Sequence, residues 1–313
     1  MPRWLKSLIA VTSVALLAAC GGGDDDAKHI TATVQDTPRF SVLSEAITAA
    51  GLEATLRGPG PFTVFAPTND AFTALLGELG VTKDQLLADK ALLTQVLTYH
   101  VVAGEVPKAA VPLGQPITTV QGAIFKVDTV GAELVITDGR NRSAKITATD
   151  VDAENGVIHV VDRVILPANR NVVETAVALA SASPAEFTIL VEAVVAADLA
   201  GVLSGSGPFT VFAPTDAAFA ALLGELGVTK DQLLADKDLL TAVLAYHVVP
   251  GRVLKAQVPV GTAIATVQGG SFSVDTSLQI TDGRDRRAAI VATDVLATNG
   301  VIHVIDKVIL PSP

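Results

Sequence analysis

The chain is poor in several residue types, and each shortage excludes a class of protein. It has one cysteine among 313 residues, so neither a disulfide framework nor a zinc or iron–sulfur site built from several cysteines can form. Lys and Arg number 22 against 32 Asp and Glu, and the net charge of −10 argues against nucleic acid as a partner. Half of the residues are hydrophobic, so a largely disordered chain is excluded as well.

The first residues are typical of an export signal. Arg3 and Lys6 precede a short apolar stretch, Leu8 to Ala19, which is too short to span a bilayer. The only Trp and the only Met of the chain, Trp4 and Met1, lie in the same segment. We therefore predict that residues 1–19 are a signal peptide that the mature protein lacks.

The end of that segment predicts a lipid anchor. Leu17-Ala18-Ala19-Cys20 matches the bacterial lipobox, in which the cysteine thiol carries diacylglycerol and becomes the new N-terminus. Residues 20–29, which begin with this Cys20 and continue with three glycines and three aspartates, are expected to form a flexible tether. The resemblance to Gram-negative lipoproteins implies an envelope protein at the outer membrane, because glycine follows the cysteine. Secretion to the exterior is the alternative.

An internal duplication organises the rest of the chain. The segment ALLGELGVTKDQLLADK at 74–90 recurs unchanged at 221–237, an offset of 147 residues. Asn155-Gly156 recurs as Asn299-Gly300 at an offset of 144, so the second copy lacks three residues, in a stretch that we interpret as a hairpin loop. We predict two tandem domains, domain 1 (30–167) and domain 2 (170–313), whose short junction restricts their relative orientation.

Within each copy, the pattern changes from helices to strands. Apolar residues at helical spacing predict a helix over 40–50, Thr68 and Asp89 are placed as helix caps, and Thr82 with Gln85 forms a capping box. From about Ile117 the pattern has a period of two, with hairpin signals at Asp138-Gly139 and Asn155-Gly156. Phe62–Ala66 is predicted as a strand that Pro67 ends, and Val157–Leu166 as a buried central strand. This segregation of helices and antiparallel strands predicts an α+β fold.

Three signatures resemble the fasciclin domain family. They are Phe62-Thr-Val-Phe-Ala-Pro-Thr-Asn-Asp-Ala-Phe72, Val96-Leu-Thr-Tyr-His-Val-Val102 and the run from Asn155 to Pro167, and all three recur in the second copy. The resemblance implies a wedge-shaped β-sandwich core flanked by short helices. It also implies a secreted or surface-bound protein that mediates adhesion and has no catalytic role.

The resemblance also gives the candidate binding residues. Tyr99-His100 and Tyr246-His247 are the Tyr-His element of the family, which is either an adhesion-linked site or a buried structural pair. Asp150-Val151 and Asp294-Val295 match an Asp-aliphatic pair that is linked to integrin contact in animal members. A strand-end aspartate that bonds nearby backbone is the alternative for this second pair.

Residues with other possible chemistry have structural interpretations. His159 and His303 lie within a predicted core strand, and neither copy offers three nearby His or Cys residues for a metal site. Asp138, Asp150 and Asp162 recur in the second copy, but they fall at turns and strand ends rather than as a glycosidase pair. The chain lacks a G-x-S-x-G elbow and glycine-rich phosphate loops. We predict no enzyme activity, no metal and no cofactor.

The combined prediction is a surface-anchored, non-catalytic adhesion or interaction protein that makes cell–cell, cell–matrix or envelope contacts. Its expected partners are protein or polysaccharide surface ligands, with the membrane engaged through Cys20. The alternative is a periplasmic or surface carrier of a small apolar or glycan ligand, which requires a well-formed apolar pocket. A hydrolase is a third hypothesis, and it requires a cleft with perturbed carboxylates.

Overall fold

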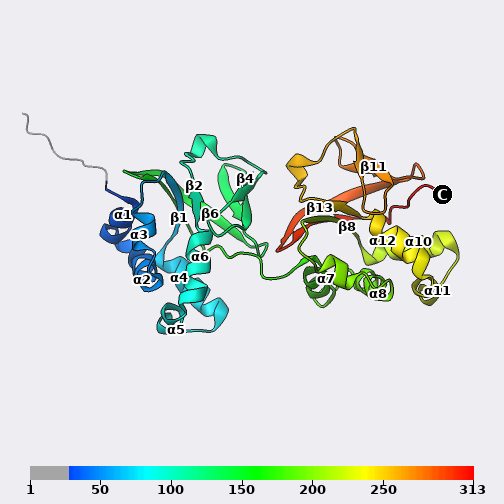
Figure 1. Cartoon of the computed structure of the whole chain (residues 1–313), viewed down its shortest axis with the longest axis horizontal. Helices are drawn as coiled ribbons and strands as arrows, with labels where there is room; N and C mark the ends of the chain where they lie inside the picture. The colour runs from blue at the N-terminus through cyan, green and yellow to red at the C-terminus, as the bar shows by residue number, and fades with distance from the viewer. Residues whose placement is uncertain (1–27) are drawn as a thin grey trace, which may run out of the picture.

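One arrangement of helices and strands occurs twice along the chain, as Figure 1 shows. The structure is a computed structural model that describes residues 28–313. The predicted signal peptide, Cys20 and most of the tether lie outside the described residues. Within the described part, no helix combines the length and the hydropathy that crossing a bilayer requires.

Domain 1 begins with helices and continues with strands, as the sequence pattern predicts. Its helices are α1 (Ile30–Asp36), α2 (Ser41–Ala50), α3 (Glu53–Leu56), α4 (Asn69–Leu79), α5 (Lys83–Ala88) and α6 (Lys90–Tyr99). Its strands are β1 (Phe62–Pro67), β2 (Val101–Ala103), β3 (Pro116–Thr118), β4 (Ile124–Val130), β5 (Glu133–Thr137), β6 (Ser143–Ala153) and β7 (Gly156–Val161). Short 3₁₀ turns lie at Pro38–Phe40 and Lys108–Ala110.

Domain 2 repeats this order. Its helices are α7 (Val172–Ala180), α8 (Thr188–Ala196), α9 (Ala200–Leu203), α10 (Asp216–Leu226), α11 (Lys230–Ala235) and α12 (Lys237–Tyr246). Its strands are β8 (Phe209–Pro214), β9 (Val248–Pro250), β10 (Ala263–Ala265), β11 (Ser271–Val274), β12 (Gln279–Thr281), β13 (Arg287–Ala297) and β14 (Gly300–Ile305), with a 3₁₀ turn at Lys255–Gln257. The three missing residues shorten the β11–β12 hairpin relative to β4–β5, as predicted.

The predicted helix starts have the expected bonds. The Thr68 hydroxyl accepts a hydrogen bond from Ala71 N at 3.3 Å, and Asp89 Oδ1 accepts one from Leu92 N at 3.0 Å. Thr82 and Gln85 form the complete capping box, with each side chain bonded to the backbone N–H of the other. These bonds satisfy N–H groups that have no partner inside the helix, so they fix where each helix begins.

The seven strands of domain 1 have the order β2-β1-β7-β6-β5-β4-β3, and domain 2 has the same order of equivalent strands. The prediction of antiparallel strands misses one pair in each domain, because β1 runs parallel to β7 and β8 runs parallel to β14. The central strand also ends earlier than predicted. Val164, Ile165 and Leu166 are buried, but Ile165 N and Leu166 N donate to the side chains of His100 and Asp138 rather than to a neighbouring strand.

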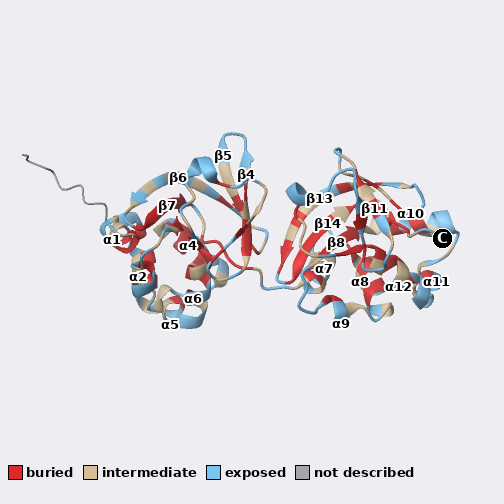
Figure 2. Cartoon of the chain, turned by 45° about the horizontal axis from the view of Figure 1, so that its top comes forward, coloured by how far each residue is buried: buried red, intermediate tan, exposed pale blue. Residues whose placement is uncertain are grey.

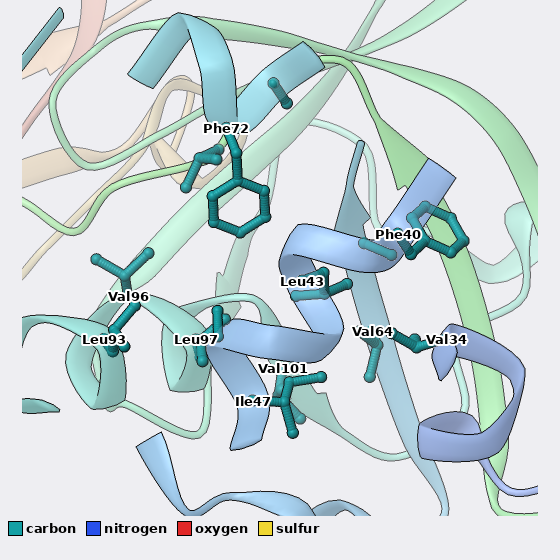
Figure 3. Close-up of a cluster of buried hydrophobic side chains, with 14 of the residues drawn as sticks. Val34, Phe40, Leu43, Ile47, Val64, Phe72, Leu93, Val96, Leu97 and Val101 are labelled. Atoms are coloured by element: carbon teal, nitrogen blue, oxygen red, sulfur yellow. The ribbon is translucent and has the colours of Figure 1, made fainter. Parts of the chain in front are cut away.

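Each domain has two apolar cores, one on each side of its central strands. In domain 1, helices pack on one face of the β2-β1-β7 part of the sheet around Phe40, Phe72 and Leu97, as Figure 3 shows. The long strand β6 pairs with β7 on one side and with β5 on the other. Through this connection, β3, β4 and β5 enclose a second core with β1 and β7. Phe65 and Phe125 meet there edge to face, with ring centroids 5.0 Å apart. Figure 2 shows the buried residues along these strands in both domains. This is the sandwich flanked by helices that the family resemblance implies.

Candidate interaction faces and the contact between the domains

The Tyr-His element lies at the end of α6, where the chain enters β2. Tyr99 is fully buried, and its hydroxyl donates to Ile124 O at 2.7 Å and accepts from Gly139 N at 2.8 Å. Burial is the main cause that raises the pKa of this phenol, so the hydroxyl keeps its proton. Tyr99 therefore connects the helix to the β4 and β5 ends of the sandwich, and its side chain does not reach the surface.

His100 is equally enclosed. Its Nε2 accepts a hydrogen bond from Ile165 N at 3.0 Å, so Nδ1 carries the ring proton and donates it to Val96 O at 2.7 Å. Burial lowers the pKa of His100 to about 4, so the ring is neutral at neutral pH. The ring therefore supplies one donor and one acceptor to the backbone of its own domain.

Tyr246 and His247 repeat most of these bonds in domain 2, although Gly283 N donates to Leu310 O rather than to the Tyr246 hydroxyl. The Tyr246 hydroxyl donates to Ser271 O at 2.6 Å, and the His247 ring bonds Val243 O at 2.7 Å and Ile309 N at 3.1 Å. Burial lowers the pKa of His247 to about 4 as well. The side chains of Tyr99, His100, Tyr246 and His247 are all buried and bonded within their own domains, which fits the buried structural pair rather than an exposed binding site.

The duplicated aspartates Asp150 and Asp294 lie in bulges of β6 and β13. Both have left-handed backbone conformations, with φ of 56° and 62°. Oδ1 of Asp150 accepts from Lys108 N at 2.7 Å, and Oδ1 of Asp294 accepts from Lys255 N at the same distance. Each bulge thus holds its carboxylate in one orientation, with Oδ1 bonded inside the domain.

A core histidine supports each of these bulges. His159 Nε2 donates to Val106 O at 2.9 Å, and its Nδ1 faces the N–H of Asp150 at 3.3 Å. His303 makes the same two contacts with Val253 O and Asp294 N, and burial lowers its pKa. The prediction that these histidines are satisfied core residues fits these bonds, and the bonds also show that they position the aspartate turn.

The valines that follow the aspartates point inward. Val151 is partly buried and packs against the helix–sheet core of domain 1, and Val295 packs against the equivalent core of domain 2. Their main contacts are therefore within the fold, and the aspartate is the member of each pair that has an oxygen to offer. Within each Asp-Val pair, the valine therefore contacts its own domain, and the aspartate is the residue whose side chain can bond a partner.

The two aspartates differ sharply in their surroundings. Asp150 is exposed, and none of the described residues bonds its Oδ2. The side chain of Asp294 is only 2% exposed, because domain 1 lies against it and Lys126 Nζ is 2.8 Å from its Oδ2. One aspartate face is thus occupied by a domain of the same chain, whereas its counterpart is open.

Lys126 is held by two carboxylates. Its Nζ also lies 3.0 Å from Asp128 Oδ2, and its side chain is 11% exposed. Burial opposes the charge of this lysine, but the hydrogen bonds and charges of Asp294 and Asp128 outweigh burial and raise its pKa. The ammonium group therefore stays charged and forms a charge-assisted bond between the domains.

Two further contacts also join the domains. The side chain of Asn141 makes a pair of bonds with the backbone of Leu296, from Nδ2 to Leu296 O at 3.0 Å and from Leu296 N to Oδ1 at 2.6 Å. Ile124 packs with the side chains of Leu254, Leu296 and Val301 of domain 2. These contacts account for the restricted orientation of the two domains that the short junction predicts.

Sequence reasoning missed Lys126 and Asn141, although a signal was available. The two copies differ at these positions, because Ser273 replaces Lys126 and Asp285 replaces Asn141 in domain 2. The receiving face differs too, since Asp152 of domain 1 stands where domain 2 has Leu296. Interface residues are thus found where the repeats diverge, whereas the shared motifs are largely buried.

The remaining polar clusters have structural bonds. Asp138 is 1% exposed and accepts from the backbone of Arg140, Arg142 and Leu166, while the Arg142 guanidinium lies 2.7 Å from its Oδ2. Asp162 Oδ1 accepts from Lys145 N at 2.7 Å. Within residues 28–313, no three His, Cys, Asp or Glu side chains are placed to hold a metal ion.

Similarity to known proteins covers most of the chain. The fasciclin domain family matches residues 38–167 and 185–311. Protein sll1483 of Synechocystis is 48% identical over 128 residues, which is 40% of this chain and 67% of that protein.

Two animal proteins match across both domains. The transforming growth factor-beta-induced protein ig-h3 of Sus scrofa is 29% identical over 83% of this chain and 36% of its own length. Human periostin is 27% identical over 87% of this chain and 30% of its own length. The chain thus spans about a third of these animal relatives.

Among solved structures, a FAS1 domain pair from the insect cell adhesion molecule Fasciclin I matches with a TM-score of 0.42 and 19% identity. The match covers 90% of this chain and 95% of that one. The family match itself spans well over half of the residues, in two consecutive copies. The chain belongs to the fasciclin domain family and consists, in its described part, of two tandem fasciclin domains.

Proposed function

We propose that this chain is a non-catalytic adhesion protein whose exposed Asp150 face binds a basic partner. One observation carries the proposal. The equivalent face of domain 2 already makes a protein–protein contact, in which Lys126 bonds Asp294. The Asp150 bulge has the same backbone conformation and the same bond to its Oδ1, but its Oδ2 is open to solvent. A lysine of a partner therefore fits Asp150 as Lys126 fits Asp294.

The charge around Asp150 favours a basic partner. Asp152 and Glu154 are exposed further along β6 and its turn into β7, and Glu105 is exposed ahead of the 3₁₀ turn, whose exposed Lys108 contributes one positive charge. Domain 2 has Arg252, Leu296 and Thr298 at the equivalent positions, and Leu296 bonds Asn141 of domain 1. A cluster of carboxylates steers a cationic partner toward the face and discriminates against acidic ones.

Family membership and the predicted lipid anchor support a role at the cell surface. Fasciclin domains occur in adhesion and interaction proteins. A lipid on Cys20 and a tether of about ten residues, which spans roughly 17 Å as a coil, would hold domain 1 close to the membrane. The Asp150 face then belongs to the domain that the tether reaches first, and it mediates cell–cell, cell–matrix or envelope contacts.

Bead adhesion tests this function. Beads coated with residues 28–313 are mixed with the producing cells and with panels of matrix proteins and polysaccharides. We expect saturable binding that Asp150→Asn reduces about tenfold, the loss typical of one charge-assisted contact. Asn tolerates the left-handed conformation and keeps an acceptor for Lys108 N, so the bulge itself is preserved.

Asp84→Asn is the matched control, because Asp84 is an exposed aspartate of domain 1 on α5, away from the bulge. It should leave adhesion unchanged. If Asp84→Asn and Asp150→Asn weakened adhesion equally, the loss would come from the change in overall charge and not from the Asp150 face. Binding to no member of the panel would remove the adhesion proposal.

A carrier of a small apolar ligand is the second candidate, favoured by a groove in domain 2. The groove lies between α7, α8 and α9, is lined only by Val, Leu, Ile and Ala side chains, and encloses about 60 Å³. Val191 and Val195 on its wall stand where domain 1 has Ser44 and Thr48. A cavity of this size takes the end of an alkyl chain, roughly two water-sized groups.

Binding of n-alkanols of increasing length tests the carrier function. Affinity should rise about threefold to fourfold per methylene until the groove is filled. The double variant Val191→Ser with Val195→Thr, which restores the residues of domain 1, should abolish the rise. Val291→Thr changes an exposed valine on β13 and is the control. An unchanged length dependence in the double variant would contradict the groove as the site.

A further inference from the structure

A basic pocket lies where the two domains and the segment between them meet. It encloses about 270 Å³, and residues of both domains and of the junction line it. The polar part of its lining consists of Arg140, Asn141, Arg142, Asn169, Arg170 and Thr175. Three guanidinium groups therefore converge in a chain whose net charge is −10.

Only one of the three arginines has its charge matched by a carboxylate. Arg142 lies 2.7 Å from Asp138 Oδ2 and 2.7 Å from Glu78 Oε2. Neither Arg140 nor Arg170 forms an ion pair with any residue in 28–313. Arg140 Nε is moreover buried without a hydrogen-bond acceptor in the described part of the chain. A buried charged donor without an acceptor is costly, so the pocket is incomplete as it stands.

The electrostatic surroundings of Arg140 agree with this geometry. Burial and the charge of Arg142 lower the pKa of the Arg140 guanidinium, and Arg170 adds to the effect, while Asp138 and Glu78 oppose it. A negative group placed among Arg140, Arg142 and Arg170 would reverse that repulsion. The pocket is therefore complementary to an anion.

The second repeat provides an internal comparison. Arg284 occupies the position of Arg140 in domain 2, and its Nε donates to Pro311 O at 3.1 Å. The same arginine is thus satisfied within its own domain in one copy and left with an unused donor in the other. Arg140 lies at the junction, where Arg170 and Leu296 line the same pocket.

We propose that this pocket binds an oxyanion group, a carboxylate, sulfate or phosphate, of a ligand from outside the chain. Guanidinium groups present paired N–H donors that match the oxygen spacing of such groups. Arg140 and Arg170 supply the unused charge, and Asn169 adds neutral donors. Asn141 is already engaged with Leu296, so it holds the wall of the pocket in place. This site is separate from the Asp150 face and attracts ligands of the opposite charge.

Anion binding by residues 28–313 tests the proposal. Sulfate, phosphate and acetate are titrated separately, with chloride at matched ionic strength as the reference, and followed by calorimetry and by the NMR signal of the Arg140 Nε–H group. We expect saturable binding of at least one oxyanion and a shift of that signal. Which salt binds distinguishes a tetrahedral oxyanion from a carboxylate.

Variants of the unused arginines give the decisive comparison. Arg140→Gln and Arg170→Gln should each weaken binding about tenfold or more, because each removes a charge-assisted contact without breaking an ion pair of the fold. Arg284→Gln is the matched control in the second repeat and should bind as the wild type does. Overturning results are binding no stronger than that of chloride, or equal losses in Arg284→Gln. Neither result bears on the Asp150 proposal, which the bead assay tests.

Discussion

Lys126 Nζ of domain 1 lies 2.8 Å from Asp294 Oδ2 of domain 2, and this bond closes over the one aspartate of the duplicated pair that is not exposed. The bond joins residues that are 168 positions apart in the chain. Lys126 thus occupies the Asp294 carboxylate of domain 2, whereas the equivalent Asp150 carboxylate of domain 1 is open to solvent. The difference in exposure between the two aspartates therefore depends on this ion pair and its surroundings.

Lys126→Met should release the two domains from each other. The substitution leaves Asp294 buried without its cation, and breaking a buried pair from one side costs about 3–5 kcal/mol, part of which Asp294 recovers by gaining water as the interface opens. Domain tumbling rates from NMR relaxation should then separate, while each domain stays folded. Lys145→Met, which removes an exposed pair with Glu133, is the control and should leave tumbling unchanged. Joint tumbling in Lys126→Met would mean that Asn141 and Ile124 hold the domains alone.

Acid should destabilise both domains through their buried histidines. The folded-state pKa of His100 and of His247 is lowered to about 4, so the unfolded chain, with a histidine pKa near 6.5, binds more protons between those values. Stability is therefore fully present above about pH 6.5 and falls as the pH drops toward 4, by about 3 kcal/mol for each histidine. Urea unfolding at a series of pH values measures this. Stability that stays constant from pH 7 to 4.5 would contradict a buried neutral ring.

Tyr99→Phe should weaken domain 1 and leave domain 2 unchanged. The hydroxyl satisfies both Ile124 O and Gly139 N, and its loss leaves two buried backbone groups unpaired at a cost of about 2–3 kcal/mol. Urea unfolding followed by NMR signals of each domain separates the two transitions. Tyr246→Phe should reverse the pattern. A shift of both transitions in either variant would indicate that the domains unfold as one unit.

Gly156→Ala should prevent domain 1 from folding. Gly156 has φ of +145°, and an added Cβ would collide with Phe62 O in the paired strand β1. The strand pair β1–β7 must then separate, at a cost of more than about 4 kcal/mol. Gly80→Ala is the control, since φ there is +66° but nothing lies near the added atom, so a cost of about 1 kcal/mol is expected. Amide exchange of the β7 residues distinguishes the two variants.

The elements that local rules determine were predictable from the sequence. The caps at Thr68, Thr82 and Asp89, the hairpin at Asn155-Gly156 and the loop that absorbs three deleted residues all follow from patterns within a few positions. The parallel pairing of β1 with β7 was missed because those strands are separated by about 90 residues. No period or turn signal reports which distant strands become neighbours.

The candidate site was predictable only in part, for a similar reason. Sequence motifs identified Asp150 and Asp294 but assigned them equal roles, since the two copies are alike around them. Their difference comes from Lys126, which the chain brings from the other domain. The Tyr-His element was placed correctly at the end of a helix, but a motif alone cannot tell a buried ring from an exposed one.

The contact between the domains joins two unlike faces. The giving face, on domain 1, contributes the side chains of Lys126 and Asn141, and the receiving face, on domain 2, contains Asp294 and Leu296, to which they bond. Unlike faces that recur at both ends of a subunit allow open-ended growth into a filament. In this chain the corresponding faces of the two repeats differ in charge. The giving face of domain 2 has Ser273 in place of the lysine, and its Asp285 would meet Asp152 on the receiving face of domain 1, where two negative charges repel. Because the repeats have diverged, domain 2 lacks the residues with which domain 1 makes this contact, so the contact is specific to the pair of domains within the chain.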